Sequence, residues 1–306
     1  MTLFWTILGC AANILVVLAV APLCEGVLRK VTARIQSRQG PPLLQPWFDL
    51  LKLLGKEDLE SGESPAMQRF AASLSLATML TVAGLLPLGF ASPLAGAGDL
   101  VLLIYLLTLA GISTLLAGLA AGSTYSLIGM SREMITMIAL EPLFAITLVI
   151  GALKVGSFRL DRVLDGSVYA GGGVPWSGLI MLAVMVLSFQ AFVQRVPFDT
   201  AEAETEIMEG PLIEYSGPKL ALFKYAQMAR LVIHSSLFVA LFVPWGSDWA
   251  FPLGWGFFWL KVLGLVLLVT LVAATHARYR IDQALNYYGG LLGVAFLALA
   301  LAAFGY

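Results

Sequence analysis

Apolar runs of about 20 residues recur along the chain, broken by glycine, proline or clusters of charge, and constrain its fold more than any other feature. A helix of about 20 apolar residues is long enough to cross the hydrocarbon core of a bilayer. The sequence therefore predicts an all-α polytopic membrane protein, a single transmembrane domain over residues 1–306 with about eight helices. The predicted spans are 3–28, 68–90, 99–121, 134–153, 175–194, 219–245, 254–276 and 285–304.

The composition excludes several other classes of protein. Hydrophobic residues make up 59% of the 306 residues and the mean hydropathy is +0.88, whereas a soluble domain of this length needs a far more polar surface. The first apolar run lacks the basic N-terminal region of a cleavable signal peptide and is long enough to span a bilayer. A net charge of −1 excludes a broadly basic surface for nucleic acid.

Metal-ligating residues are scarce. Cys10 and Cys24 both lie in the first predicted span and form no Cys-x-x-Cys pair, and His234 and His276 are the two histidines. No recognised iron–sulfur or haem pattern is present. We expect no metal on this chain, so any redox metal belongs to a partner.

The distribution of basic residues predicts the orientation. Four connections, at about 29–67, 122–133, 195–218 and 277–284, carry twelve lysines and arginines with their flanks, against three in the intervening connections. Because cytoplasmic loops are enriched in these residues, we expect the four connections to face the cytoplasm and both termini to face outside. The twelve are Arg29, Lys30, Arg34, Arg38, Lys52, Lys56, Arg69, Arg132, Arg195, Lys219, Arg278 and Arg280.

The first of these connections predicts an amphipathic helix. Gly40, Pro41 and Pro42 form a rigid turn, because Pro42 disfavours the helical conformation at Pro41. Apolar residues then recur at helical spacing from Leu43 to Leu54. Such a helix lies in the membrane interface or against a partner; a surface helix that merely covers the end of the bundle is the alternative.

Residues 196–217, VPFDTAEAETEIMEGPLIEYSG, concentrate negative charge and are named the acidic segment below. Asp199 or Thr200 is expected to cap a helix on which Glu202, Glu206 and Glu209 share one face, spaced i, i+4 and i+7. A solvated acidic face is the simplest interpretation. The interleaved apolar residues instead favour a segment that packs inward, where neighbouring acids share protons.

The acidic segment resembles the PFD-x-x-EAE-x-E…EYSG signature of a family of membrane subunits. Its members are the arm-docking H-type subunit of respiratory complex I and the equivalent subunit of energy-converting [NiFe] hydrogenases. The resemblance extends to ARIQSRQGPPLLQPWFDLLKLLGKED, to GSTYSLIGMSRE…ALEP (residues 122–142) and to ARYRIDQ (residues 277–283), so it covers nearly the whole chain.

Several residues resemble the hydrogenase branch, which includes the membrane subunits of formate hydrogenlyase. Complex I members carry a small residue in place of Glu209 and a histidine-containing stretch in place of GPLI before EYSG. The SRE…EP arrangement around Arg132 and Glu141 is also similar to the hydrogenase branch, and QGPPLLQP replaces the GPNR run of quinone-reducing members.

The resemblance implies that the acids at Glu141, Glu202, Glu204, Glu206 and Glu214 couple redox chemistry to ion movement. We add Asp199 and five residues chosen from the sequence alone, namely Glu209, Lys224, Arg230, His234 and Lys261. A charge at the centre of a span costs roughly 2.5–3.5 kcal/mol and needs a reason. The alternative for each buried charge is a structural ion pair, and for His234 an ordinary interhelical hydrogen bond.

A second predicted set would dock the peripheral redox arm. It comprises Arg34, Arg38, Gln45, Asp49, Lys52, Arg132, Arg278, Arg280 and Asp282. The partners that the resemblance implies are a [NiFe] large subunit, a small iron–sulfur subunit, a ferredoxin-like subunit and antiporter-like membrane subunits. The [NiFe] centre and the iron–sulfur clusters are expected on those partners, and membrane lipid surrounds the chain.

The sequence therefore predicts a membrane subunit, not catalytic alone, of an energy-converting [NiFe] hydrogenase complex in the cytoplasmic membrane. It would couple electron transfer to the movement of protons or sodium ions. One alternative is the subunit that forms the quinone site of an NADH–quinone oxidoreductase-like complex. A secondary transporter acting alone is disfavoured by the absence of an obvious internal repeat and by the long loops.

Overall fold

The computed structural model describes residues 2–59, 64–89, 94, 96, 98–170, 174–246 and 249–305, excepting the side chains of residues 2–3 and 204–205. These residues form helices joined by turns, and among them no β-strand occurs beyond one isolated bridge between Asp99 and Arg159. The predicted all-α class is therefore confirmed.

Eight long helices occupy the positions of the eight predicted spans in the described part of the chain. They are α1 (Thr2–Ile35), α3 (Pro65–Leu85), α4 (Leu100–Ala121), α5 (Thr124–Val155), α7 (Trp176–Phe192), α9 (Gly217–Phe242), α10 (Leu253–Thr275) and α11 (Ile281–Ala303). By length and composition, α1, α4, α5, α9, α10 and α11 can each cross a membrane, and α7 is a shorter apolar helix. The polytopic architecture is thus borne out.

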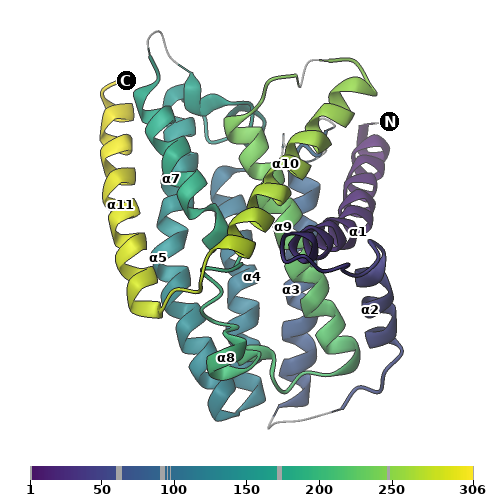
Figure 1. The fold of residues 1–306 in the computed structure, drawn as a ribbon. Coiled ribbons are helices and arrows are strands. Elements are labelled where there is room, and N and C mark those ends of the chain that lie inside the picture. Colours follow the sequence, from purple (N-terminus) through teal and green to yellow (C-terminus); the bar gives the residue numbers. More distant parts are fainter. Residues whose placement is uncertain are drawn as a thin grey trace.

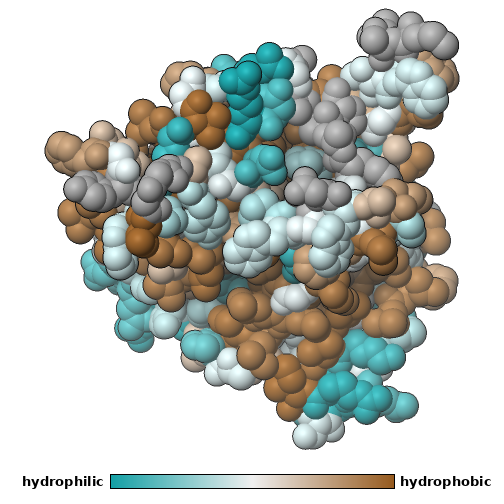
Figure 2. Space-filling model, turned by 90° about the horizontal axis from the view of Figure 1, so that it is seen from above, coloured by the Kyte–Doolittle hydropathy of each residue, from teal (hydrophilic) through white to brown (hydrophobic). Residues whose placement is uncertain are grey.

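The long helices run side by side, and both termini lie at the end of the bundle opposite the acidic segment (Figure 1). The acidic end, named the loop face here, is formed by residues 36–59, 122–123, 193–216 and 276–280. Figure 2 views the opposite end, where hydrophobic side chains cover much of the surface between small hydrophilic patches.

Helix α9 forms the centre of the bundle. It packs against α1, α2 (Gln45–Leu54), α3 and α10, and 83% of its most apolar stretch is buried, against 22% for α10. Among the described helices long enough to span a membrane, α9 is the least apolar, and polar residues of membrane helices face the interior of the bundle. The polar residues that α9 carries are therefore held inside the protein, which positions them for the site described below.

The amphipathic helix predicted after the proline turn is confirmed as α2. Its inner face buries Pro46 and Leu50, whereas Phe48 and Leu51 remain exposed at 57% and 60%. The connection approaches α1 closely, since a Cβ on Gly26 would lie 2.0 Å from the Leu43 carbonyl oxygen. The helix is thus fixed to the bundle while it presents an apolar face outward.

The helix predicted across the acidic segment is wrong. Only α8 (Glu204–Ile207) is helical, with Ala203 in place of Asp199 or Thr200 at its N-terminus. Met208 adopts a left-handed φ of +57°, which ends the helix. A 3₁₀ turn, η2 (Gly210–Leu212), follows, and Glu202 and Glu209 therefore do not share a helix face with Glu206. Packing overrides local helix propensity here: a Cβ on Gly210 would lie 2.1 Å from the Ala201 carbonyl oxygen.

Candidate functional site

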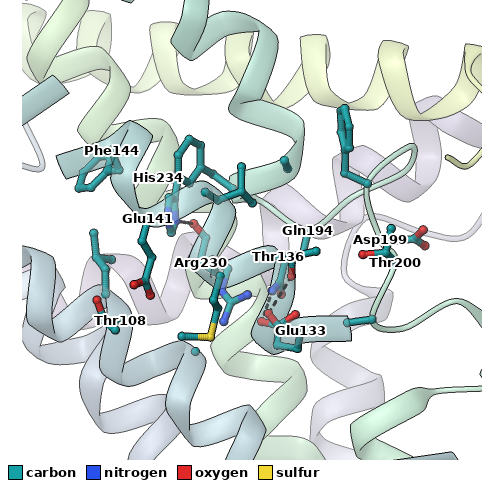
Figure 3. A pocket seen from close by; sticks show the side chains of 18 of the residues that line it. Thr108, Glu133, Thr136, Glu141, Phe144, Gln194, Asp199, Thr200, Arg230 and His234 are labelled. Carbon is teal, nitrogen blue, oxygen red and sulfur yellow. Dashed lines mark hydrogen bonds between the residues drawn. The ribbon is translucent and has the colours of Figure 1, made fainter. Parts of the chain in front are cut away.

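A cavity of about 90 Å³ lies between α4, α5, α7, α9, α11 and the acidic segment (Figure 3). This volume has room for several water molecules. Its polar walls include Thr108, Glu133, Thr136, Glu141, Gln194, Asp199, Thr200, Glu202, Arg230, His234 and Tyr288. The cavity therefore extends from the loop face into helices that can span the membrane.

Glu133 is the most deeply enclosed acid of the cavity. It lies on α5 with 4% of its surface exposed, and its Oε1 accepts a hydrogen bond of 2.5 Å from the Gln194 side-chain amide. Arg230 on α9 is close enough to interact electrostatically with this carboxylate. A buried carboxylate needs such partners, because an isolated charge in a low-dielectric interior is very costly.

Gln194 lies in the turn that ends α7, in a left-handed conformation with φ of +54°. Its backbone N–H donates to the Ala191 carbonyl at 3.0 Å, and that of Arg195 donates to the Gln190 carbonyl at 3.1 Å. This pattern is a Schellman motif, in which glycine is the usual left-handed residue. A residue with a Cβ costs about 1–2 kcal/mol there, so the turn holds the glutamine at the expense of backbone strain.

Arg230 and His234 occupy successive turns of α9. The Nδ1 of His234 lies 2.9 Å from the Arg230 carbonyl oxygen, and the ring stacks on Phe192 with centroids 6.1 Å apart. Because a carbonyl oxygen only accepts, Nδ1 carries a proton and Nε2 is the ring nitrogen that can accept one. Arg230 is 8% exposed, so its guanidinium is a fixed positive charge inside the protein.

Glu202 connects the acidic segment to the cavity. Its Oε1 accepts a hydrogen bond from the Gln227 side chain on α9, and its charge interacts with Lys224, Glu133, Arg195 and Arg230. Burial raises the pKa of Glu202 above its ordinary value, and the nearby Lys224 opposes this shift. A carboxyl group with a raised pKa takes up a proton more readily than a solvated one.

Glu141 lies deeper along α5 than Glu133 and is partly buried. The Thr108 hydroxyl on α4 is within hydrogen-bonding reach of its carboxyl group, and the charge of Glu133 acts on it as well. The predicted coupling residues Glu141, Glu202, Asp199, Arg230 and His234 are thus brought to one cavity.

Three acids of the acidic segment form separate ion pairs, among them Asp199, which also lines the cavity. Asp199 accepts two hydrogen bonds of 2.6 Å from Arg278. Glu206 pairs with Arg132 at 2.6 Å. Glu209 lies 3.6 Å from Lys224. Each acid therefore has its own cation, in place of the shared acidic face that the sequence predicted.

A further network ties Arg195, the residue before the acidic segment, to α1 and α2. Arg195 bonds to Glu25 at 2.5 Å, and Glu25 also bonds to Arg29 at 3.3 Å. Arg29 also donates to the Asp49 carboxylate at 2.7 Å, and the Gln45 side-chain amide donates to the same carboxylate at 2.9 Å. Burial alone would raise the pKa of Asp49. The hydrogen bonds from Gln45 and Arg29 and the positive charges of Arg29 and Lys52 outweigh burial, so the pKa of Asp49 lies below its ordinary value. The network joins three elements of the loop face.

The remaining predicted residues lie elsewhere. Lys261 donates to the carbonyl oxygens of Val243 and Trp245 at 2.7 and 2.8 Å, which satisfies backbone groups beyond the C-terminus of α9, away from the cavity. Glu214 is half-buried outside the residues that line the cavity, and the side chain of Glu204 lies outside the described residues. Of the predicted docking residues, Arg34, Arg38, Lys52, Arg280 and Asp282 are exposed.

Sequence reasoning missed Glu133, Gln194 and Tyr288. Glu133 could have been found, because it precedes Glu141 by eight residues and so falls on a similar side of the same helix. Gln194 carried no such signal, since the turn at the end of α7 and its left-handed residue are visible only in the structure. Among the described residues, no group of three or more histidines, cysteines or acids is arranged to hold a metal ion.

The fold and the cavity define a multi-pass membrane protein with an enclosed array of ionisable groups that opens toward a charged loop face. Residues 8–303 match the family described as NADH dehydrogenase, and the chain belongs to that family.

Three relatives match this chain over most of their length, two from hydrogenase complexes and one from an NADH-quinone oxidoreductase. Formate hydrogenlyase subunit 4 of Escherichia coli (strain K12) is 34% identical, covering 93% of this chain and 94% of the relative. Hydrogenase-4 component C of the same organism is 36% identical, covering 94% and 93%. The H-type subunit of the NADH-quinone oxidoreductase of Burkholderia vietnamiensis is 32% identical, covering 91% and 86%.

A solved structure has the same fold. A chain in the structure of the membrane-bound sulfane sulfur reductase, described as an archaeal respiratory membrane complex, superposes with a TM-score of 0.86 at 25% identity. The match covers 97% of this chain and 99% of that one.

Proposed function

We propose that this chain is the membrane subunit of an energy-converting hydrogenase complex, which docks a peripheral redox arm and couples electron transfer to ion movement. The observation that carries the proposal is the continuous array of ionisable groups from the loop face, through Glu202, to Glu141 within α5. The similarity to formate hydrogenlyase subunit 4 and hydrogenase-4 component C over more than nine-tenths of the chain supports the hydrogenase assignment.

The mechanism follows from the position of the acidic segment. The acidic segment packs on α4 and α5 and bonds to α9 through Glu202 and to the α10–α11 connection through Asp199. Arg195, just before it, pairs with Glu25 of α1, so a displacement at the loop face changes the surroundings of Glu202. Redox change in the arm alters the charge or position of this segment, and the protonation of Glu202 follows. The proton then moves between Glu202 and the deeper acids through water in the cavity.

The partners belong to the same proposal. A [NiFe] large subunit, a small iron–sulfur subunit and a ferredoxin-like subunit supply the metal centres, and antiporter-like subunits move protons or sodium ions. The docking surface for the redox arm is formed by charged residues of the loop face. They are the exposed Arg34, Arg38, Lys52, Arg280 and Asp282, together with Arg132 and Arg278. The chain lies in the cytoplasmic membrane with its loop face inside and both termini outside.

Co-purification tests the assignment. The tagged chain, solubilised gently from its native membrane, should retain a subunit with two Cys-x-x-Cys pairs that ligate nickel, and the preparation should evolve or consume hydrogen. Recovery of NADH-oxidising subunits with quinone reductase activity would overturn the hydrogenase assignment and favour the second candidate.

Coupling is tested in vesicles that contain the whole complex. Glu141→Gln and Glu206→Gln should lower the number of ions moved per hydrogen turned over while the complex stays assembled. Glu206→Gln weakens the bond to Arg132 and leaves the cavity acids in place, so it reports on the loop face. Normal ion movement in both variants would refute the proposed role of these acids.

The second candidate is the quinone-site subunit of an NADH–quinone oxidoreductase-like complex. It is favoured by the 32% identity to the Burkholderia vietnamiensis relative, but the two Escherichia coli relatives are more similar. The apolar face of α2, with Phe48 and Leu51 exposed, would then border the ligand's entrance.

A further inference from the structure

Glu133 interacts electrostatically both with Glu202 of the acidic segment and with Glu141, the acid deeper in α5. Its charge acts on Glu202 in the acidic segment, on Glu141 in α5 and on Tyr288 in α11. Arg230 supplies the positive charge that acts on both Glu133 and Glu202. Two carboxylates that share one guanidinium favour a state in which one of them is protonated.

The spacing along α5 requires an intermediate group or water. Glu133 and Glu141 are eight residues apart, which corresponds to about 12 Å along the helix axis. This separation is too long for a direct transfer between the two carboxyl groups. The cavity of about 90 Å³ that both residues line has room for the water that would bridge them.

The turn at the end of α7 places a hydrogen-bond donor on Glu133. Glycine would adopt the left-handed conformation of residue 194 with less strain. The glutamine found there instead donates from its side-chain amide to the Glu133 carboxylate at 2.5 Å. Strain of this kind persists where the surrounding structure requires that residue, and here the side chain contacts the most buried acid of the cavity.

We propose that Glu133 is the intermediate proton carrier between Glu202 and Glu141, and that Gln194 is the positioning residue that holds its carboxyl group toward Arg230. This inference rests on the proposed coupling function and deepens it by assigning a step to a residue outside the coupling set predicted from the sequence.

The step is a simple proton transfer. The O–H bond of the Glu202 carboxylic acid breaks and an O–H bond forms on Glu133, through water, leaving Glu202 ionised beside Lys224 and Arg230. The proton then passes through cavity water to Glu141, and Glu133 returns to the ionised form that Arg230 and Gln194 stabilise. No electron is exchanged within the chain.

The test uses the whole complex and three variants. Glu133→Gln removes the proton-carrying group, and Gln194→Gly keeps the left-handed turn but removes the amide donor. Glu57→Gln is the matched control, because Glu57 is an exposed acid of the loop face outside the cavity. The two readouts are ions moved per hydrogen in vesicles and the infrared difference band of a protonated carboxylic acid on reduction of the arm.

Glu133→Gln should abolish one carboxylic-acid band and slow proton transfer at least roughly 100-fold, so that ion movement per hydrogen is lost. Gln194→Gly should shift the frequency of the same band, because it removes a hydrogen bond to the Glu133 carboxyl group. If the complex with Glu133→Gln does not assemble, Gln194→Gly alone tests the inference. Glu57→Gln should change neither readout.

A role for Glu133 as a mere structural partner of Arg230 predicts unchanged bands in both cavity variants, and that result overturns the inference. If Glu141→Gln abolishes ion movement while Glu133→Gln moves ions normally, the inference fails and the proposed function stands. If Glu141→Gln, Glu206→Gln and Glu133→Gln all move ions normally, the proposed function fails together with the inference.

Discussion

At the scale of single residues, the acids of the acidic segment have different surroundings and therefore different roles. Asp199 and Glu206 are held by Arg278 and Arg132 at the loop face, whereas Glu202 is drawn into the cavity and bonded to the Gln227 amide. A half-exposed ion pair such as Glu206–Arg132 contributes little to stability, while burial makes a carboxyl group sensitive to its protonation. We therefore expect the stability of the protein to depend on pH through Glu202, and the acidic segment to loosen when Asp199 or Glu206 loses its partner.

The pH dependence of stability should carry the signature of Glu202. Its folded pKa lies above the ordinary value of 4.5, so the native state binds this proton more tightly than the unfolded chain. Stability contributed by this carboxyl group is therefore present at low pH and falls as pH rises from about 4.5 through the folded pKa. Glu202→Gln should flatten that part of the profile when the apparent Tm of the purified complex is followed against pH. An unchanged profile would contradict the burial of this acid.

The Asp199–Arg278 pair should show strong coupling in a double-mutant cycle. Two charge-assisted hydrogen bonds of 2.6 Å between partly buried groups predict a coupling free energy of about 1.5–3 kcal/mol. Asp199→Asn and Arg278→Lys, alone and combined, provide the cycle in thermal unfolding of the complex. Arg278→Lys keeps the charge but loses the two-pronged geometry, so it should destabilise nearly as much as Asp199→Asn. Strict additivity would show that the two side chains act independently.

At the scale of elements, α5 and the acidic segment form one close contact. A Cβ on Gly129 would lie 2.6 Å from the Pro211 Cδ and 2.8 Å from the Gly210 Cα, and the Ser126 hydroxyl lies 3.3 Å from the Pro211 carbonyl oxygen. The glycine therefore lets η2 rest directly on α5, one turn before Glu133. The position of the acidic segment is set by this backbone contact as well as by its ion pairs.

Gly129→Ala should consequently disturb coupling without removing any charge. The added methyl group must displace η2, which we expect to destabilise the segment by about 1–3 kcal/mol and to lower the number of ions moved per hydrogen. Gly264→Ala on α10 is the matched control, because a Cβ there meets nothing within 4 Å. Limited proteolysis should cut the acidic segment faster in Gly129→Ala alone. Equal cleavage in both variants would argue against the contact.

Hydropathy predicted the eight long helices, and the proline turn followed by helical apolar spacing predicted α2. Each rests on a pattern within one element. The acidic segment was misjudged because Glu202, Glu206 and Glu209 satisfy a helical spacing that the contacts at Gly210 and the turn at Met208 override. The contact between Glu133 and Gln194 joins residues 61 apart in sequence, and no local pattern encodes such a pairing.

At the scale of the whole molecule, the charged connections and the acidic segment gather at one end, and the termini lie at the other (Figure 1). By the positive-inside rule, the basic residues of that end support our proposal that it faces the cytoplasm. All cavity acids would then face the compartment in which the redox arm works.

Thiol labelling tests this orientation. In a background with Cys10 and Cys24 replaced by alanine, Phe304→Cys places a thiol on an 81% exposed residue near the C-terminus, and Gln39→Cys places one on the loop face. An impermeant reagent should label Phe304→Cys in intact cells and Gln39→Cys in inverted vesicles stripped of peripheral subunits. The reverse pattern would place the loop face outside.

The apolar wall at the deep end of the cavity bears on whether this chain alone would let protons leak across the membrane. Beyond Thr108 and Glu141 the lining includes the apolar side chains of Ile104, Leu107 and Phe144, and the ammonium group of Lys261 is held by backbone oxygens. We therefore expect protons admitted at the loop face to stop part-way across this chain. A chain inserted ahead of its partners should then leave the transmembrane gradient intact.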